Sequence, residues 1–326
     1  MNHKPRILVV GSFVMDLIVT TRRFPKSGET VLGYAYQTVP GGKGANQAIQ
    51  AARLNAEVTM VGKLGNDAFG RELLHSAKAA NVDVSHVILM EDTFSAIGNV
   101  QVERDENHTQ NRIIVVPGAN MEITFRDVEF LKEDIAEYDL VMLQQEIPME
   151  INLLVADYAS AKGVPIMLNS APYAPIPPEM LKKLTYISPN EYEAEAITGI
   201  SLQTDQDVSM ALKALRKMGV RNALITLGSR GVAYEGADGQ MKLSPALKGL
   251  NVMDTTAAGD SFVGAFCVAV SSGLSVESAL RFANHTAAIT VCRMGSQPSL
   301  PTIDEVVSLM RERCCDLAPY AGLLAE

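Results

Sequence analysis

Short apolar runs that alternate with helical segments are the feature that most restricts how this chain can fold. The runs lie at residues 6–12, 58–62, 139–143, 165–168, 186–188 and 223–227. A strand that is joined through a helix to the next strand pairs in parallel, and a parallel sheet needs cover on both faces. The pattern therefore predicts an α/β protein with three layers, α/β/α, around a mostly parallel central sheet.

Composition limits the classes of protein that this chain can be. A length of 326 residues and a hydrophobic share of 47% suit a single domain that spans residues 1–326. A net charge of −9 with no basic stretch argues against nucleic-acid binding. No apolar run approaches membrane-spanning length, and the first one is expected to be a strand rather than a signal peptide.

The four cysteines indicate a reducing compartment. None has the spacing of a zinc site, and the adjacent pair Cys314 and Cys315 is poorly suited to an internal disulfide. We therefore expect a cytoplasmic protein. The tail at residues 314–326 is apolar enough to pack against the body, but the sequence does not say where.

A second, smaller sheet is predicted outside the core. Strand patterns occur at 17–21 and 30–38, before any helix, and the runs at 95–102 and 112–116 resemble a hairpin across the polar turn 105–110. We expect these segments, within about 13–40 and 95–116, to form a small sheet. Its apolar face would need a ligand or a partner subunit as cover.

A glycine-rich turn, Pro40–Ala48, precedes the first helical run. Glycines such as Gly42 and Gly44 allow the backbone to approach a ligand, and Lys43 and Asn46 offer donors. The spacing fits neither a Walker A loop nor a dinucleotide fingerprint. A plain glycine-rich turn remains the alternative.

The stretch Asp254–Phe262 is a loop that leads into a helix. Its small residues Ala257, Ala258 and Gly259 leave backbone N–H groups bare at a helix start, where an anion can bind. The next residue, Asp260, could take a proton from an attacking hydroxyl. The alternative is an ordinary helix N-terminus with an aspartate in its first turn.

Informative residues recur just beyond the predicted strands. They are Gly11, Glu146, Asn169, Asn190 and Gly228. Ligands of open parallel sheets bind beyond the carboxyl ends of the strands, so this recurrence predicts a site at that edge.

Two of these strand ends suggest binding of a nucleotide and its metal. Glu193 follows Asn190 by three residues and could hold Mg²⁺ through water, although acidic residues also favour the first turn of any helix. The small-residue turn Thr226–Gly231 suits a nucleotide phosphate or ribose.

From Gly11 to about Pro301, the chain resembles the ribokinase-like (PfkB) family of ATP-dependent sugar kinases. The stretches 41–48 and 254–260 carry the resemblance, supported by 190–195, 226–231 and 295–299. It implies a ribokinase-like fold with a small β-sheet lid, the substrates ATP and a sugar, the ion Mg²⁺, and K⁺ or another monovalent cation as activator. It also implies a homodimer through the lid.

The resemblance assigns roles to individual positions. Asp260 would be the base, with an anion hole from the backbone of Ala257, Ala258 and Gly259. The sugar would be held at Val14, Met15, Asp16, Gly42, Lys43, Gly44, Asn46 and Glu146. The nucleotide would be held at Asn190, Thr226, Gly228, Ser229, Gly231 and Asn284, with Glu193 on Mg²⁺ through water. The monovalent cation would lie at Asp254, Thr256, Thr290, Arg293, Gly295 and Ser299.

One position departs from the family pattern. Ribokinases carry Asn-x-Asp where this chain has Val14, Met15 and Asp16. Valine cannot bond a sugar 2-hydroxyl, a loss of roughly 1–3 kcal/mol, or about tenfold to a hundredfold in specificity. We therefore predict phosphorylation of the 5-hydroxyl of 2-deoxyribose. Ribose remains the alternative, with Val14 a neutral change that Met15 or a water compensates.

Three other functions are considered. One differs from a pentose kinase in its substrate, and two differ in their class. A nucleoside or fructose-phosphate kinase of the same fold is the nearest. A non-catalytic sugar sensor is disfavoured because Asp260 and the small residues before it are intact. A hydride-transferring enzyme is disfavoured because no G-x-G-x-x-G follows the first strand.

Overall fold

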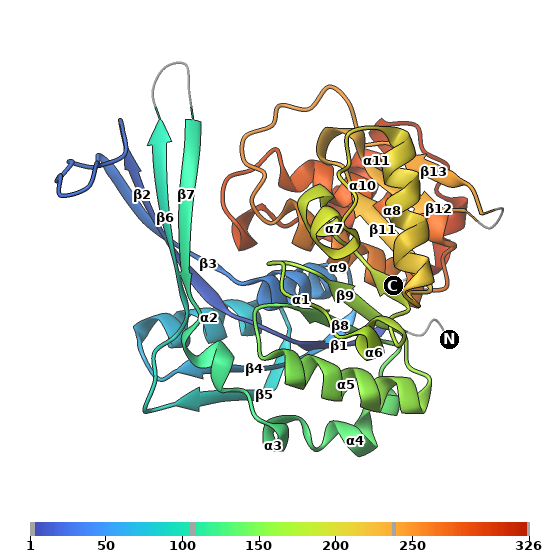
Figure 1. Cartoon of the computed structure of the whole chain (residues 1–326), viewed down its shortest axis with the longest axis horizontal. Coiled ribbons are helices and arrows are strands. Elements are labelled where there is room, and N and C mark those ends of the chain that lie inside the picture. Colours follow the sequence, from blue (N-terminus) through green and yellow to red (C-terminus); the bar gives the residue numbers. More distant parts are fainter. Residues whose placement is uncertain (1–3, 105–108, 237–238, 325–326) are drawn as a thin grey trace.

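The computed structural model describes residues 4–104, 109–236 and 239–324 (Figure 1). Within these residues, nine strands form the central sheet. In spatial order they are β13 (Met241–Ser244), β12 (Val232–Glu235), β11 (Asn222–Thr226), β10 (Tyr186–Ile187), β9 (Ile166–Asn169), β8 (Leu140–Gln144), β1 (Arg6–Val10), β4 (Glu57–Gly65) and β5 (Asp83–Met90). Neighbours from β11 to β5 pair in parallel, whereas β11–β12 and β12–β13 are antiparallel. The predicted mostly parallel sheet is confirmed.

Helices cover both faces of this sheet. One face is covered by α1 (Lys43–Arg53), α2 (Ala68–Ala79), α9 (Ala258–Ser271), α10 (Val276–Thr290) and α11 (Ile303–Glu312). The other is covered by α3 (Phe125–Val128), α4 (Leu131–Asp134), α5 (Met149–Lys162), α6 (Pro178–Leu181), α7 (Glu191–Thr198) and α8 (Asp205–Lys217). Short 3₁₀ turns η1 to η5 lie at Gly118–Glu122, Ile135–Glu137, Gly228–Arg230, Gln297–Ser299 and Ala318–Tyr320. The three-layer α/β/α prediction is therefore confirmed.

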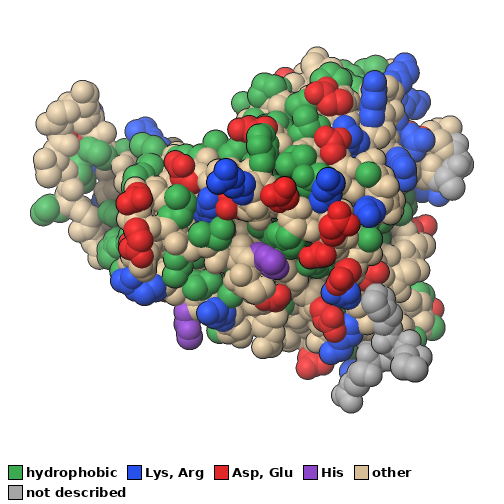
Figure 2. All heavy atoms as spheres, turned by 90° about the horizontal axis from the view of Figure 1, so that it is seen from below, with side chains coloured by type: hydrophobic (Ala, Val, Ile, Leu, Met, Phe, Trp, Pro, Cys, Tyr) green, Lys and Arg blue, Asp and Glu red, His purple; other side chains and the backbone are tan. Residues whose placement is uncertain are grey.

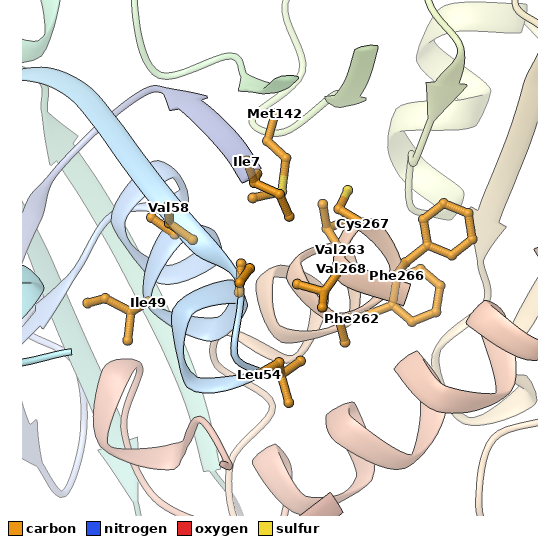
Figure 3. Close-up of a cluster of buried hydrophobic side chains, with 14 of the residues drawn as sticks. Ile7, Ile49, Leu54, Val58, Met142, Phe262, Val263, Phe266, Cys267 and Val268 are labelled. Carbon is orange, nitrogen blue, oxygen red and sulfur yellow. The ribbon is translucent and has the colours of Figure 1, made fainter. Parts of the chain in front are cut away.

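The alternation of side chains along the strands divides the core in two. In β1, Ile7 belongs to the hydrophobic cluster on the α9 side, and Leu8 belongs to the cluster on the α5 side. Figure 3 shows Ile7 and Met142 from the sheet gathered beside Val263 and Cys267 of α9. Because both faces are buried, the strands read as continuous apolar runs in the sequence.

A separate four-stranded sheet has the order β3 (Ala35–Gly41), β2 (Val14–Thr21), β6 (Ile97–Arg104) and β7 (Thr109–Val116). The predicted hairpin is present, since β6 and β7 pair antiparallel. Residues 105–108 of its predicted turn, 105–110, lie outside the described residues. Figure 1 shows these strands reaching away from the main body, and Figure 2 shows charged side chains of both signs interspersed on one face of the molecule.

The strand predicted at 30–38 is displaced. The structure begins β3 at Ala35 and continues it to Gly41. The last strand pair with β2 joins Thr20 to Ala35. The backbone N–H of Tyr34 still donates to the carbonyl of Thr20 at 2.9 Å, but residues 30–34 lie outside the strand, and Leu32 is 89% exposed. The apolar pattern alone could not reveal where the pairing partner ends.

The C-terminal tail packs on α10. It forms η5 and α12 (Ala321–Leu324). Tyr320 is only 1% exposed, its hydroxyl donates to the carbonyl of Ser278 over 3.2 Å, and its ring lies 6.1 Å from that of Phe282. Across the described part of the chain, no helix is long and apolar enough to cross a membrane.

We predict that Tyr320→Ala lowers the free energy of unfolding by about 3–5 kcal/mol, because it empties a fully packed aromatic site. Tyr320→Phe keeps the ring and loses only the hydrogen bond to Ser278, so it should cost about 1 kcal/mol. Urea denaturation of the two variants measures both values. Equal costs would contradict the packing of the ring on α10.

Candidate active site

The start of α9 is built to receive an anion. Its N-cap residue, Ala257, has a positive φ of 58° and makes no side-chain capping bond. Gly259 lines a large cavity, and a Cβ at this glycine would meet no protein atom within 4 Å. Any side chain there would occupy the space in front of the helix, where the backbone N–H groups and the helix dipole favour negative charge.

Asp260 is held by two amides from the first turns of α1. It is 6% exposed. Its Oδ2 accepts a hydrogen bond from Nδ2 of Asn46 at 2.9 Å, and its Oδ1 accepts one from Nε2 of Gln47 at 3.0 Å. The carboxylate of α9 therefore has a fixed orientation beside the glycine-rich turn.

A cavity of about 1050 Å³ joins the segments that were predicted to bind the nucleotide and the phosphoryl group. The predicted residues that line it are Lys43, Asn190, Glu193, Thr226, Gly228, Ser229, Gly231, Ala257, Ala258, Gly259, Asp260 and Asn284. This volume is in the range of pockets that hold a small ligand or cofactor.

The end of the cavity that Gly231 and Asn284 line is shaped by backbone contacts. Gly231 has a positive φ of 101°, and a Cβ there would lie 2.1 Å from the carbonyl oxygen of Ser244. Asn284 of α10 donates to that same carbonyl at 3.1 Å and to the carbonyl of Pro245 at 3.2 Å. These contacts hold the turn after β11, the end of β13 and α10 together around one opening.

Lys43 lies among carboxylates. Burial lowers the pKa of its ammonium group, but four negative charges outweigh burial and leave the pKa raised. In order of effect, the charges are those of Asp260, Glu146, Glu193 and Asp16. Lys43 therefore stays protonated and can meet a further negative charge in the cavity.

Asp16 carries the clearest electrostatic signature. Burial is the main cause that raises its pKa from 3.8 to about 6. The hydroxyl of Ser296, which donates to Asp16 Oδ2 at 3.3 Å, lowers the pKa, whereas the charges of Glu146 and Asp260 raise it. An acid in this condition, next to a proposed catalytic group, is typical of a functional site.

Val14 shares a face of β2 with Asp16, because residues two apart in a strand point the same way. It is 4% exposed. Gly98 lies opposite Asp16 in β6, and a Cβ there would be 2.3 Å from Asp16 Oδ1 and 3.6 Å from Cγ1 of Val14. The missing side chain at Gly98 therefore leaves room for both groups.

Two predicted sugar residues lie elsewhere. Met15 is 0% exposed and packs in the hydrophobic cluster on the opposite face of β2. Gly44 is a close-contact glycine, because a Cβ there would lie 2.4 Å from the backbone nitrogen of Ser12. Both positions support the site from behind.

Glu146 ties the end of β1 to the start of α1. Its Oε2 accepts hydrogen bonds from the hydroxyl of Ser12 and, at 2.9 Å, from the backbone N–H of Lys43. This carboxylate therefore positions the glycine-rich turn as well as facing the Asp16 side.

Asn190 and Glu193 form a capping box at the start of α7. Each side chain accepts from the backbone N–H of the other, and Asn190 Nδ2 also donates to Glu193 Oε1 at 3.0 Å. Burial is the main cause that raises the pKa of Glu193; the charge of Lys43 lowers it and that of Asp260 raises it. The ordinary capping role is therefore present, on a carboxylate that also lines the cavity.

Some of the residues predicted for a monovalent cation meet where the loop before α9 contacts the turn after α10. Asp254 accepts from the backbone and hydroxyl of Thr256 through Oδ1, and from the backbone of Gly295 through Oδ2. The guanidinium of Arg293 pairs instead with Glu305. The remaining two side chains, those of Thr290 and Ser299, bond inside the protein to Ser261 and to the carbonyl of Ser296.

Sequence reasoning missed several polar residues that support the site. These are Ser12, Gln47, Gln144, Ser188 and Ser296. Gln47 stood within the glycine-rich motif, and Gln144 stood at the end of a predicted strand, so both had a positional signal. Ser296 stood within the stretch 295–299, but nothing in the sequence linked it to Asp16, because only the fold brings the two together.

The chain belongs to the pfkB family of carbohydrate kinases, whose model matches residues 4–303. It is therefore a sugar kinase of the ribokinase type. A ribokinase from Bacillus subtilis is 41% identical over 304 residues, covering 93% of this chain and 99% of the relative. A deoxyribokinase from Salmonella typhi is 31% identical over 300 residues, covering 92% and 96%.

A solved structure extends the comparison to three dimensions. The structure of Arabidopsis thaliana ribokinase complexed with ribose and ATP aligns with a TM-score of 0.87 at 35% identity, covering 95% of this chain and 99% of the other. The fold predicted from the sequence is the fold of these relatives.

We predict that Asp16→Asn stabilises the protein at neutral pH. The folded pKa of Asp16 is raised, so its ionisation opposes folding: wild-type stability is fully present below about pH 4 and is lost as the pH rises through about 6. The variant escapes this loss, which is on the order of 3 kcal/mol for a pKa raised from 3.8 to about 6. Urea denaturation at about pH 5 and at about pH 8 should show a larger advantage for the variant at the higher pH. An advantage that does not grow with pH would contradict the assignment.

Proposed function

We propose that this protein transfers the γ-phosphoryl group of ATP to the 5-hydroxyl of 2-deoxyribose. The observation that carries the choice of sugar is the apolar side chain of Val14 on the Asp16 face of β2. An apolar wall offers no partner to a 2-hydroxyl, whereas it suits a carbon that bears only hydrogen. The similarity to a deoxyribokinase supports the proposal.

Asp260 acts as the base in the proposed transfer. The sugar oxygen forms a bond to the γ-phosphorus as the bond from that phosphorus to the oxygen of ADP breaks, and the hydroxyl proton goes to Asp260. The backbone of Ala257, Ala258 and Gly259 would receive the charge that develops on the phosphoryl oxygens. The ammonium of Lys43, which lines the same cavity, adds to this field.

The shape and lining of the cavity support binding of ATP and Mg²⁺. The open space at Gly259 and Gly228, where a Cβ would meet no protein atom within 4 Å, suits phosphate groups. Asn190, Thr226, Ser229, Gly231 and Asn284 would surround the rest of the nucleotide. Mg²⁺, held through water at Glu193, would neutralise phosphate charge.

A monovalent cation such as K⁺ fits the loop that Asp254 organises. Its contacts to Thr256 and Gly295 bring that loop against the turn after α10. Because this loop leads directly into the anion hole, an ion there would stiffen Ala257 and its neighbours. Thr290, Arg293 and Ser299 would contribute through backbone oxygens, since their side chains are engaged elsewhere.

The four-stranded sheet is proposed to act as a lid and as a dimer surface. Ile113 and Ile114 are adjacent in β7, so they point to opposite faces, yet they are 56% and 63% exposed. One exposed apolar face would cover the sugar, and the other would pack against the sheet of a second copy in a homodimer.

Ribose is the second candidate substrate. The observation that favours it is the 41% identity to a ribokinase, compared with 31% to a deoxyribokinase. Because a pocket that lacks a partner rejects an added hydroxyl only weakly, ribose could also be turned over.

We predict that Asp260→Asn lowers kcat about 10²- to 10⁴-fold with little change in the Kd of the sugar, because the base is lost and the pocket is kept. Release of ADP measures the first quantity, and calorimetry measures the second.

Asp207→Asn is the matched control, since Asp207 is also the third residue of a helix, α8, but its carboxylate only caps that helix. It should lose stability and keep its turnover. Near wild-type turnover in Asp260→Asn would sink the base assignment.

We predict that Val14→Asn shifts the ratio of kcat/KM for 2-deoxyribose over ribose toward ribose by about tenfold to a hundredfold, because an amide can bond the 2-hydroxyl. Val14→Leu, of similar size to the asparagine variant but apolar, should leave the ratio near that of the wild type. The sugar proposal fails if the wild type strongly prefers ribose, or if the two variants behave alike.

A further inference from the structure

Four buried amide and carboxylate side chains form a connected chain behind the proposed base. Gln144 Nε2 donates to Gln47 Oε1 at 2.7 Å, and Gln47 Nε2 donates to Asp260 Oδ1 at 3.0 Å and to Asn169 Oδ1 at 3.2 Å. Both glutamines are 0% exposed. The chain thus joins the ends of β8 and β9 to α1 and α9.

The chain has one consistent polarity. An ionised carboxylate only accepts hydrogen bonds, so Gln47 must turn its NH₂ group toward Asp260 and its carbonyl toward Gln144. Gln144 must then present its own NH₂ group. At the other branch, Asn169 accepts from Gln47 and donates to the backbone carbonyl of Ser188 at 2.9 Å, which can only accept.

In the part of the chain that the structure describes, the orientation of the Gln144 amide leaves its carbonyl oxygen unpaired and requires a glycine at position 11. Gln144 Oε1 is buried and has no hydrogen-bond partner among the described residues. A Cβ on Gly11 would lie 2.2 Å from that oxygen, so only glycine at the end of β1 admits the amide in this position. A buried unpaired carbonyl is unfavourable, which indicates that the opposite, donating end of Gln144 is the end that matters.

We propose that Gln47 is a positioning residue for the phosphoryl transfer, and that Gln144 acts on the reaction only through Gln47. Gln144 sets the direction of the Gln47 amide, and that amide holds Asp260 Oδ1, leaving the carboxylate turned so that it can receive the proton of the sugar hydroxyl. Asn46, which donates to Oδ2, cannot replace this support because it holds the other oxygen. The inference rests on the proposed role of Asp260.

The test replaces each glutamine by methionine, which has a similar length and cannot bond to the amide chain. Gln47→Met should lower the rate of phosphoryl transfer in a rapid-quench experiment, at saturating sugar and ATP, by about tenfold to a hundredfold, because a hydrogen bond to a charged group is lost. The Kd of the sugar should change by less than about threefold. The acid limb of the transfer rate should move to higher pH, because the charged carboxylate loses a donor.

Gln50→Met is the matched control. Gln50 is also a 0% exposed glutamine of α1 that contacts α9, but its amide bonds the carbonyl of Pro301 and the hydroxyl of Ser261. It should lower the melting temperature in the same way as Gln47→Met while leaving the acid limb of the transfer rate in place.

The double variant shows whether Gln144 acts through Gln47 or whether the two glutamines act independently. If Gln144 works through Gln47, Gln144→Met should slow transfer, and adding it to Gln47→Met should slow transfer no further. If Gln47→Met is too unstable to assay, Gln144→Met alone carries the test, since Gln144 bonds Gln47 rather than Asp260 and its single variant should still show the shifted acid limb.

The outcomes distinguish this inference from the proposed function. If Asp260→Asn is inactive but Gln47→Met transfers at the rate of Gln50→Met with an unmoved acid limb, the positioning role is overturned and the base assignment stands. If the two glutamine variants slow transfer independently, so that their effects multiply, the dependence of Gln144 on Gln47 is overturned. An active Asp260→Asn overturns the base and the positioning role together.

Discussion

The two hydrogen bonds that join Asp260 to Asn46 and Gln47 hold together the parts on which the site depends. They connect the first turns of α1 and α9, which come from opposite ends of the chain. Both helices lie on the same face of the central sheet, and their starts meet beyond the ends of β1 and β8. A small shift of either helix would separate the proposed base from the glycine-rich turn. Packing of α9 against Ile7 and Met142 resists such a shift (Figure 3).

The contact between the starts of α1 and α9 also brings several charged side chains close together. Four carboxylates act on one lysine, so negative charge exceeds positive charge around Lys43. Ionised Asp16 is destabilising in the fold, which is the expected condition of a group kept for binding rather than for stability. Asp16 can be buried here because Gly98 has no side chain, which leaves the space that the Asp16 carboxylate occupies.

Much of the fold could be predicted because the apolar runs are continuous. Strands buried on both faces, such as β1, β8 and β11, stand out in the sequence. The prediction missed β5, β12 and β13, which lie toward the edges of the sheet. The half-exposed pattern of β5 and the exposed residues of β13 give no such run.

The site was predictable where the chemistry is local. The four consecutive small or acidic residues from Ala257 to Asp260 stood out in the sequence as a proposed anion site, and the structure brings them to the same cavity as Lys43 and Asn190. The direction in which each side chain points could not be predicted from the local sequence. Met15 follows Val14 in sequence but faces the core, and Gly44 serves a backbone contact. Ser296 reaches Asp16 from a distance of 280 residues, which no local pattern can reveal.

The close approach of Gly44 to the end of β1 has a consequence for divergence within this fold. A Cβ on Gly44 would collide with the backbone of Gly11 and Ser12, so the start of α1 is placed by contacts between main chains. Val14, in contrast, contributes a side chain from a separate sheet. If Val14 contacts the sugar as proposed, a substitution on that sheet would alter the choice of sugar without moving the main-chain framework. Relatives with this fold would then differ in substrate through one side chain while keeping the same backbone around Gly44.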